Sequence, residues 1–237
     1  MLKRLLLTKS PAGRPKEDRH NHLLPCVDDG FRSVEASLAA IKRMSDEGWS
    51  EFVFTPHINR ELFPSTDETL LRKVYSEFSA RIPGDWNVKT ALAAEYMCVD
   101  GLERRVSEDP ESFLRYPDGS ILVEMSYYFR SKNFETVLFE LKQAGITPVI
   151  AHPERYPYMA DDLAGIEHWC NMGCKLQLNW MSLAGVYGPQ SVEILSFLLS
   201  QNLYSYVVSD LHSLSQLDRI LEVRFPRKLE KYFNNLL

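Results

Sequence analysis

Residues 144–152 read Ala-Gly-Ile-Thr-Pro-Val-Ile-Ala-His, and this stretch contains the pattern that decides the fold. Gly145 follows an amphipathic segment, at the position where glycine supplies the left-handed backbone that ends a helix. The apolar run 149–151 is typical of a buried strand, and His152 follows it directly. The stretch therefore predicts a helix, then a strand, then a polar side chain at the carboxyl end of that strand.

The same unit recurs along the chain. Helical segments end at Gly48, Gly173 and Asn202, and a short apolar run follows each of them. With two further apolar runs, the predicted strands are residues 52–54, 91–94, 121–125, 149–151, 176–178 and 206–208. Strands that alternate with helices of about 10–15 residues form βαβ units and a mostly parallel sheet. The number of units favours an α/β fold, a closed or nearly closed barrel without a linker that divides it.

Capping residues predict where three of the helices begin. Ser33 precedes a segment whose apolar residues recur at helical spacing, and Asn133 precedes another that leads to Gly145. Residues 65–68, Ser-Thr-Asp-Glu, form a capping-box pattern before a third apolar face.

The composition excludes several classes of protein. The chain has 237 residues, and 45% hydrophobic with 25% charged residues excludes disorder. The net charge is 27 − 32 = −5 and the sequence has no basic stripe, so we expect no nucleic-acid partner. No apolar run approaches the roughly 20 residues of a transmembrane segment. We expect a flexible segment over residues 1–17 and one domain over residues 18–237.

Cysteine usage indicates the compartment. Four cysteines in this length are too few and too scattered for a disulfide scaffold. We therefore expect a reducing, cytoplasmic location.

Potential metal ligands follow the predicted strands. In a βα barrel the carboxyl ends of all strands meet on one face, so ligands that are distant in sequence converge there. The residues at these places are His57, Glu95, Glu124, His152, Asp210 and His212.

The amino-terminal block adds more ligands of the same kind. His20 and His22 have the i, i+2 spacing of two side chains on the same side of a strand, and Asp28 and Asp29 follow them. Five of the six histidines thus lie at or just beyond predicted strand ends, and only His168 does not. The pattern predicts a cluster of divalent metal ions, and nitrogen and oxygen ligands without thiolate suit Mn²⁺, Fe²⁺ or Zn²⁺.

These segments together resemble the polymerase and histidinol phosphatase (PHP) superfamily, and within it the bacterial capsule-type protein-tyrosine phosphatases. The likeness runs from about residue 18 to 215 in the family's order and spacing. The matching motifs are Asp18-x-His20-x-His22, Asp28-Asp29-Gly30, Thr55-Pro56-His57, Ala94-Glu95-Tyr96, Val123-Glu124-Met125-Ser126, Ile150-Ala151-His152-Pro153-Glu154-Arg155-Tyr156 and Ser209-Asp210-Leu211-His212.

The resemblance implies a single-domain distorted (β/α)7-type, TIM-like barrel with two to three divalent ions, Mn, Fe or Zn, at the carboxyl ends of its strands. It implies a phosphoric monoester hydrolase that acts on phosphotyrosine in the tail of a bacterial tyrosine kinase and regulates capsule or exopolysaccharide synthesis. The implied first metal takes His20, His22, Glu95 and Asp210. Glu95 bridges to a second metal held by Glu124 and His152, and a third is held by Asp29, His57 and His212.

Arg155 matches the family's phosphate-binding arginine, which offers a planar fork to two phosphate oxygens. The resemblance also places a second arginine about five residues after His212, but Leu217 occupies that position here. Arg60 and Arg219 are the alternative candidates for a second phosphate clamp.

Aromatic residues near the ligands have two interpretations. Six of them follow ligand-bearing strand ends, where they either contact a phosphotyrosine substrate or pack the mouth of the barrel: Tyr96, Tyr127, Tyr128, Phe129, Tyr156 and Tyr158. Residues 59–65 follow His57 and are either a surface loop or a rim of the substrate site.

Three other functions compete with this interpretation. Residues 26–32 satisfy Cys-x5-Arg, the loop of thiol-dependent tyrosine phosphatases, but Asp28 and Asp29 would repel phosphate and raise the thiol pKa. A histidinol-phosphate or other small-molecule phosphatase could use the same scaffold. The third alternative is a noncatalytic docking domain in which metals serve only as a brace.

Overall fold

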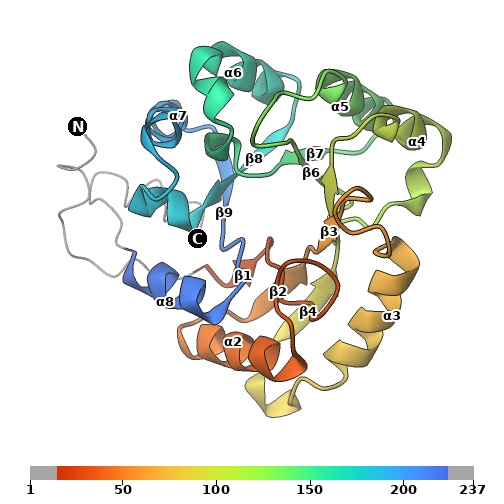
Figure 1. The fold of residues 1–237 in the computed structure, drawn as a ribbon, viewed down its shortest axis with the longest axis vertical. Coiled ribbons are helices and arrows are strands. Elements are labelled where there is room, and N and C mark those ends of the chain that lie inside the picture. Colours follow the sequence, from red (N-terminus) through yellow and green to blue (C-terminus); the bar gives the residue numbers. More distant parts are fainter. Residues whose placement is uncertain (1–14, 224–237) are drawn as a thin grey trace.

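Every strand pairing within residues 15–223, the part of the chain that the computed structural model describes, is parallel. The strands form a three-stranded sheet in the order β1-β2-β4 and a six-stranded sheet in the order β3-β5-β6-β7-β8-β9. Helices surround the strands, and α2 and α8 lie side by side at one point of this outer layer (Figure 1). The predicted α/β class with parallel strands is confirmed.

The elements alternate as the sequence predicts. The strands are β1 (Glu17–Asp18), β2 (Glu51–Phe54), β3 (His57–Ile58), β4 (Lys89–Leu92), β5 (Glu95–Met97), β6 (Ile121–Glu124), β7 (Pro148–Ile150), β8 (Lys175–Asn179) and β9 (Tyr204–Val208). The α-helices are α2 (Val34–Asp46), α3 (Glu68–Ser79), α4 (Leu102–Glu108), α5 (Phe134–Gln143), α6 (Leu163–Asn171), α7 (Pro189–Ser200) and α8 (Leu214–Glu222). Short 3-10 helices are η1 (Gly84–Trp86), η2 (Pro110–Ser112), η3 (Pro153–Arg155), η4 (Pro157–Asp161) and η5 (Trp180–Ala184).

All six predicted strands are present, but two of them are each followed, after a gap of two residues, by a second short strand. β2 and β4 stop before the predicted ligands His57 and Glu95, which instead begin the short strands β3 and β5. Pro56 has no N–H for a ladder hydrogen bond, which ends β2. Its carbonyl accepts from the Glu95 N–H at 3.0 Å across the break. His57 and Glu95 are thereby direct neighbours in the parallel ladder of the second sheet.

The first strand differs from the prediction. β1 ends at Asp18, so His20 and His22 lie beyond it in a segment that makes one bridge, between Asn21 and Leu211. The fold also begins earlier than expected, because Glu17 already pairs with β2. Residues 1–14 of the predicted flexible segment lie outside the described residues.

Two of the three helix caps also differ. The Ser33 hydroxyl accepts from the Ala36 N–H at 3.2 Å and caps α2 as predicted. For α3 the capping side chain is Asp67, one residue before the helix, because its carboxylate accepts from the Leu70 N–H at 2.8 Å. Asn133 precedes α5 but makes no capping hydrogen bond, since its amide donates to the Val99 carbonyl at 2.9 Å.

Successive residues of the strands belong to two apolar clusters. In β6, Ile121 and Val123 pack in a large cluster that includes α5, whereas Leu122 packs with Val53 and Val149 in a small one. Because side chains alternate across a strand, both faces of the sheet are apolar. The polar side chains of a functional site therefore lie at the ends of the strands.

The four cysteines are free thiols, as expected from their spacing. Within residues 15–223, none of the helices is both long and apolar enough to pass through a membrane.

Candidate metal centre

The predicted ligands converge at the carboxyl ends of the strands. Glu124 ends β6, His152 lies two residues beyond β7, and Asp210 lies two residues beyond β9. Segments that are nearly 200 residues apart in sequence are joined here, since the Ser209 N–H donates to the Asp18 carboxylate at 2.9 Å. All nine predicted ligands belong to groups whose donor atoms lie within 4.8 Å of one another.

Four side chains form a cage in which two carboxylate oxygens each lie close to the same two imidazole nitrogens. The Nε2 atoms of His20 and His22 are 3.4 Å apart. The Oε2 atom of Glu95 lies 3.2 Å from the His20 Nε2 atom and 3.4 Å from that of His22. The Oδ1 atom of Asp210 lies 3.4 Å from each of the two nitrogens.

This spacing fits one cation. Donor atoms bound to a common ion at about 2.0–2.2 Å lie about 2.8–3.6 Å from one another, in either tetrahedral or octahedral geometry. All five distances in the cage fall in this interval. They fit a metal ion without selecting among Mn, Fe and Zn.

Glu95 connects this cage to the next group. Its second oxygen, Oε1, lies 3.4 Å from the Nε2 atom of His152. The same nitrogen lies 3.7 Å from the Oε1 atom of Glu124. Glu95 thus presents one oxygen to each group, which is the arrangement that a bridging carboxylate requires.

His57 faces two groups at once. Its Nε2 atom lies 3.6 Å from the Oδ1 atom of Asp29, and the His212 Nε2 atom lies 3.5 Å from the same oxygen. Its Nδ1 atom lies 3.1 Å from Glu95 Oε2 and 3.6 Å from Glu124 Oε2. The resemblance grouped His57 with the outer pair alone, whereas the structure places it between that pair and the two glutamates.

Exposure increases along the cluster. Glu95 and Glu124 are buried, while the side chains of His57, His212 and Asp29 are 12%, 26% and 56% exposed. The cluster therefore opens to solvent at its outer group.

Several buried donor and acceptor atoms at the centre make no hydrogen bond among the described residues. They are His57 Nδ1, both carboxylate oxygens of Glu95, Glu124 Oε2, and both ring nitrogens of His152. Burying such groups without a partner costs free energy, and a bound cation would satisfy most of them.

The charges also fit a cation. Burial, and then the Glu95 carboxylate, raises the pKa of Glu124 well above its usual value. Burial acts on Glu95 in the same direction, but nearby histidines outweigh it and hold the pKa of Glu95 well below its usual value. Burial, and then Arg155, lowers the pKa of His152 to about 4, so its imidazole stays neutral and able to ligate. Divalent ions would relieve the repulsion between the two glutamates.

The backbone is strained at two of the ligands. The φ angle is +27° at His152 and +48° at Asp210, in a region that residues other than glycine rarely adopt. Such strain persists only where the surroundings over-determine the conformation, and it is often found at functional sites.

Side chains outside the nine implied ligands hold the ligands in place. Asp28 accepts from the Nδ1 atom of His22 at 2.7 Å and from the His57 N–H at 3.0 Å. The Gln177 amide oxygen accepts from the Nδ1 atom of His20 at 2.8 Å. The Asn179 amide donates to Asp210 Oδ2 at 2.8 Å, which directs the other oxygen of Asp210 to the cage.

The sequence contained a signal for each of these residues. Asp28 lies in the Asp-Asp-Gly motif, Gln177 interrupts an apolar strand, and Asn179 ends a strand. Orienting the second nitrogen of a ligating histidine is a common role for such partners.

Arg155 extends from η3 to the edge of the cluster. Its guanidinium donates to Asp210 and lies 4.5 Å from the ring centroids of both Tyr127 and Tyr187. The resemblance implies only a phosphate-binding role for Arg155, and the structure adds this hydrogen bond to a ligand carboxylate. Arg155 is therefore placed to bind an anion at the cluster and is coupled to the ligand set.

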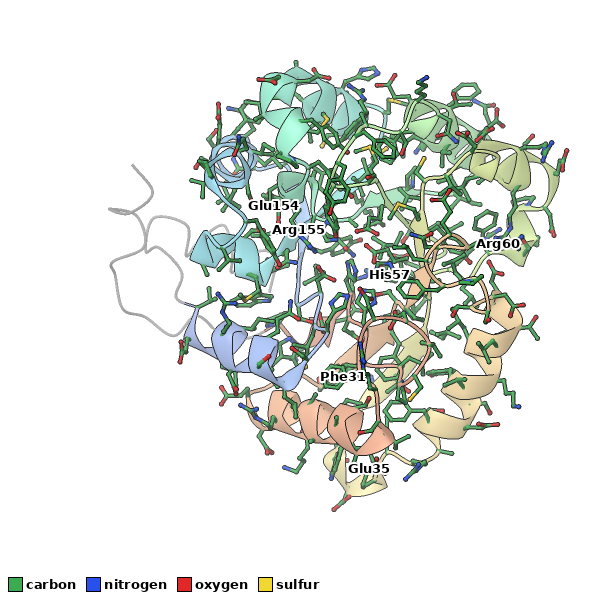
Figure 2. The ribbon with its side chains drawn as sticks, viewed as in Figure 1. Phe31, Glu35, His57, Arg60, Glu154 and Arg155 are labelled. Carbon is green, nitrogen blue, oxygen red and sulfur yellow. The ribbon has the colours of Figure 1, made fainter. Side chains whose placement is uncertain are left out.

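The other candidate arginines lack such contacts. Arg60 and Arg219 are exposed, and neither makes an ion pair with any described residue. Arg60 and Arg155 lie on either side of His57 in the view of Figure 2. Leu217, at the position where the resemblance expects an arginine, is fully buried in the apolar core.

Cys26 does not have the surroundings of a catalytic thiolate. Its Sγ atom donates to the Arg32 carbonyl at 3.1 Å, and α2 begins only at Val34. The nearby Asp28 carboxylate faces His22. The geometry therefore favours metal chemistry over thiol chemistry.

Comparison with known proteins agrees with the motifs. A family profile described as "Capsular polysaccharide synthesis, CpsB/CapC" matches residues 17–226. The tyrosine-protein phosphatase CpsB of Streptococcus pneumoniae is 27% identical over 225 residues, which cover 91% of this chain and 90% of that protein. The tyrosine-protein phosphatase YwqE of Bacillus subtilis is 26% identical over 198 residues, which cover 83% of this chain and 77% of that protein.

The solved structures show the same fold. One solved structure comes from work on YwqE from B. subtilis and CpsB from S. pneumoniae, which are described as metal-dependent tyrosine phosphatases. The chain superposes on it with a TM-score of 0.76 and 24% identity, and the match covers 93% of this chain and 95% of that one. A phosphotriesterase homology protein from Escherichia coli matches with a TM-score of 0.51 and 14% identity, over 96% of this chain and 92% of that one. The predicted family is confirmed.

Proposed function

The chain belongs to the CpsB/CapC family of capsular polysaccharide synthesis proteins, and on this premise we propose that it is a metal-dependent protein-tyrosine phosphatase. The observation that carries the proposal is a cluster of histidine and carboxylate side chains in metal-ligand groups, beside a partly buried arginine that can bind phosphate. The names of the relatives, tyrosine-protein phosphatases, support the same activity.

The site would hold two to three divalent ions of Mn, Fe or Zn. His20, His22, Glu95 and Asp210 would hold the first ion, and Glu95 would share the second with Glu124 and His152. Asp29, His57 and His212 would hold a third. Bound divalent ions supply charge neutralisation for phosphate and lower the pKa of water from 15.7 towards ~7.

The chain's own residues would bind and orient the phosphoester. The Arg155 guanidinium offers planar N–H donors to two phosphate oxygens. Its contacts with Tyr127 and Tyr187 restrict the guanidinium plane before substrate arrives. Tyrosine, with a pKa of about 10, is a better leaving group than an alkyl alcohol and needs less protonation as it departs.

The substrate would be phosphotyrosine in the tail of a bacterial tyrosine kinase, and the outcome would be control of capsule or exopolysaccharide synthesis. The family's role in capsular polysaccharide synthesis supports this assignment. The opening of the cluster at Asp29 and His212 would let a protein segment reach it from solvent. Free thiols at all four cysteines suit the cytoplasm, where such a kinase tail would be found.

The two sheets would be parts of one distorted seven-unit barrel. The bridge between Asn21 and Leu211 supports this, because it links the segment after β1 to the segment after β9. The hydrogen bond from the Glu95 N–H to Pro56 likewise continues the pairing of β2 and β4 into that of β3 and β5.

The test combines metal analysis with two substrates. The purified protein is assayed on a phosphotyrosine peptide and on histidinol phosphate, before and after chelation and after addition of Mn²⁺, Fe²⁺ or Zn²⁺. We expect hydrolysis of the peptide in preference to histidinol phosphate, loss of activity with chelator, and recovery with metal. Preference for histidinol phosphate would select the small-molecule alternative, and inactivity of the metal-loaded protein on both would reject an enzyme of this kind.

A cysteine variant tests the competing mechanism. Cys26→Ser should keep most of the activity, because the thiol has no part in the proposed reaction. An inactive Cys26→Ser protein that still binds its metals would restore the thiol mechanism.

A further inference from the structure

An aromatic side chain is stacked on the metal centre at its open end. The rings of Phe63 and His57 are nearly parallel, with centroids 5.6 Å apart and planes inclined by 12°. Phe63 remains partly exposed, and the adjacent Leu62 side chain is 69% exposed. One apolar ring thus lies beside the ligand that connects the inner and outer parts of the cluster, and an exposed leucine precedes it in the chain.

The loop that carries them is held rigidly. The Asn59 side-chain oxygen accepts from the N–H groups of Glu61 and Leu62 at 3.1 and 3.3 Å, and its carbonyl accepts from the Phe63 N–H at 2.7 Å. At the far end, the Thr66 hydroxyl donates to the Val27 carbonyl at 2.6 Å. Because these bonds fix the backbone, the apolar surface is organised before any ligand binds.

The direction of approach determines what this surface meets. The outer group is the most exposed part of the cluster, since the side chains of His212 and Asp29 are 26% and 56% exposed, so a phosphate can reach the buried ligands from there past His57. On this path the organic group attached to the phosphate would pass the Phe63 ring, which stacks on His57.

We propose that Phe63 and Leu62 form a platform for the aromatic ring of the substrate and make the site select aryl over alkyl phosphoesters. This inference rests on the proposed phosphatase function and specifies its substrate class. An aromatic contact contributes about 0.5–1.5 kcal/mol beyond area burial, which corresponds to roughly 2- to 12-fold in affinity.

A second loop with exposed aromatic side chains follows β6. Tyr128 is 91% exposed and Phe129 is 64% exposed, and they follow the ligand Glu124. The neighbouring Tyr127 hydroxyl donates to Glu124 at 2.5 Å, so this loop is anchored to the metal centre.

The sheet order fixes the separation of the two loops. Strand β5 lies between β3 and β6, from which they emerge, so two strand spacings, about 10 Å, separate the loops where they leave the sheet. An extended peptide covers that distance in about three residues. A peptide whose phosphotyrosine ring lies on Phe63 would need about three residues or more to bring apolar side chains to Tyr128 and Phe129.

The first test measures binding without turnover. Calorimetry compares phenylphosphonate with methylphosphonate on metal-loaded wild-type protein, Phe63→Ala and Phe63→Tyr. We expect the wild type to prefer the phenyl compound at least fivefold, Phe63→Ala to lose most of this preference, and Phe63→Tyr to keep it, in line with the strength of an aromatic contact. Phe139→Ala, which removes an exposed aromatic side chain on α5, is the matched control.

The ratio of the two affinities separates recognition from damage to the metal centre. Loss of metal would weaken both phosphonates equally, which metal analysis of each variant would also show. A wild-type protein without phenyl preference, or a Phe63→Ala protein that retains it, would overturn the platform. The proposed phosphatase function has its own readout, the hydrolysis of phosphotyrosine by the wild type.

The second test addresses the flanking residues. The Tyr128→Ala/Phe129→Ala double variant is assayed on a phosphotyrosine peptide with apolar neighbours and on p-nitrophenyl phosphate. The ratio of the two kcat/KM values should fall about fivefold or more, as expected for the loss of two aromatic contacts. An unchanged ratio would restrict recognition to the phosphotyrosine ring and overturn the extended surface.

Discussion

Asp28→Asn is the substitution that best tests how the histidine ligands are held. The Oδ2 atom of Asp28 accepts from the Nδ1 atom of His22 at 2.7 Å and from the His57 N–H at 3.0 Å, while Oδ1 accepts from the Gly30 N–H at 2.9 Å. Every partner is a donor. An amide of the same shape must place its NH2 group against one of them, so at least one hydrogen bond is lost together with the negative charge.

The size of the effect follows from this geometry. Mutation of a residue that orients a ligating histidine typically costs 10- to 100-fold in metal affinity, which corresponds to about 1.4–2.7 kcal/mol. We expect a loss in this range for Asp28→Asn, with the fold retained. Two histidines would be affected together, because the same carboxylate oxygen serves His22 and the backbone of His57.

The assay is a titration of the metal-free protein with Mn²⁺ or Zn²⁺ in competition with a chelator of known affinity. Circular dichroism reports on folding in parallel. Asp46→Asn is the matched control, since this residue lies on the exposed end of α2, away from the cluster. Wild-type metal affinity in a folded Asp28→Asn protein would refute the reasoning, because His22 would then be oriented by something else.

Three further predictions concern phosphate binding, packing and pH. Arg155→Ala should lower kcat/KM on a phosphotyrosine peptide by at least ~10²-fold, and Arg155→Lys should restore only part of this loss. Because the guanidinium also donates to a ligand carboxylate, the metal content of both variants should be measured. Full activity of the alanine variant would mean that another residue binds the phosphate. Gly30→Ala should destabilise the protein by about 1–3 kcal/mol in urea unfolding, because a Cβ there would lie 2.3 Å from a backbone oxygen, whereas Gly84→Ala, with no atom within 4 Å, should be nearly neutral. Burial acts to raise the pKa of Asp118, but hydrogen bonds from Ser120 outweigh it and lower this pKa from 3.8 to about 2. The carboxylate therefore stabilises the fold above pH 3.8, and this contribution is lost as the pH falls towards 2. Asp118→Asn should flatten this part of a plot of unfolding free energy against pH, and an unchanged slope would contradict the prediction.

Local pattern was sufficient for most of the fold. Glycine stops, apolar runs and the Ser33 cap depend on interactions within a few residues, so α2 and the six predicted strands are where the sequence places them. The short strands β3 and β5 were not predicted, and β1 was expected at His20 and His22 but lies at Glu17–Asp18. Two or three residues carry no periodicity, and these strands exist because neighbouring strands supply their hydrogen bonds.

The candidate ligands could also be selected from the sequence, because histidine and carboxylate side chains recur where predicted strands end. Their partners could not. Gln177 and Asn179 are ordinary strand residues until the fold brings them to His20 and Asp210. The contact of Arg155 with Asp210 likewise depends on how η3 leaves its strand, and spacing in sequence does not define that direction.

By itself, the sequence determined the α/β class, the family and the chemistry of the ligands, because periodicity and side-chain type are properties of single segments. The tertiary structure alone decided that His57 faces two groups of ligands, that Asp28 orients His22, and that Phe63 stacks at the open end of the cluster. Each of these depends on the relative position of side chains from different segments to within a few ångströms. That position is set by the packing of strands and helices against one another and is not encoded in any one segment.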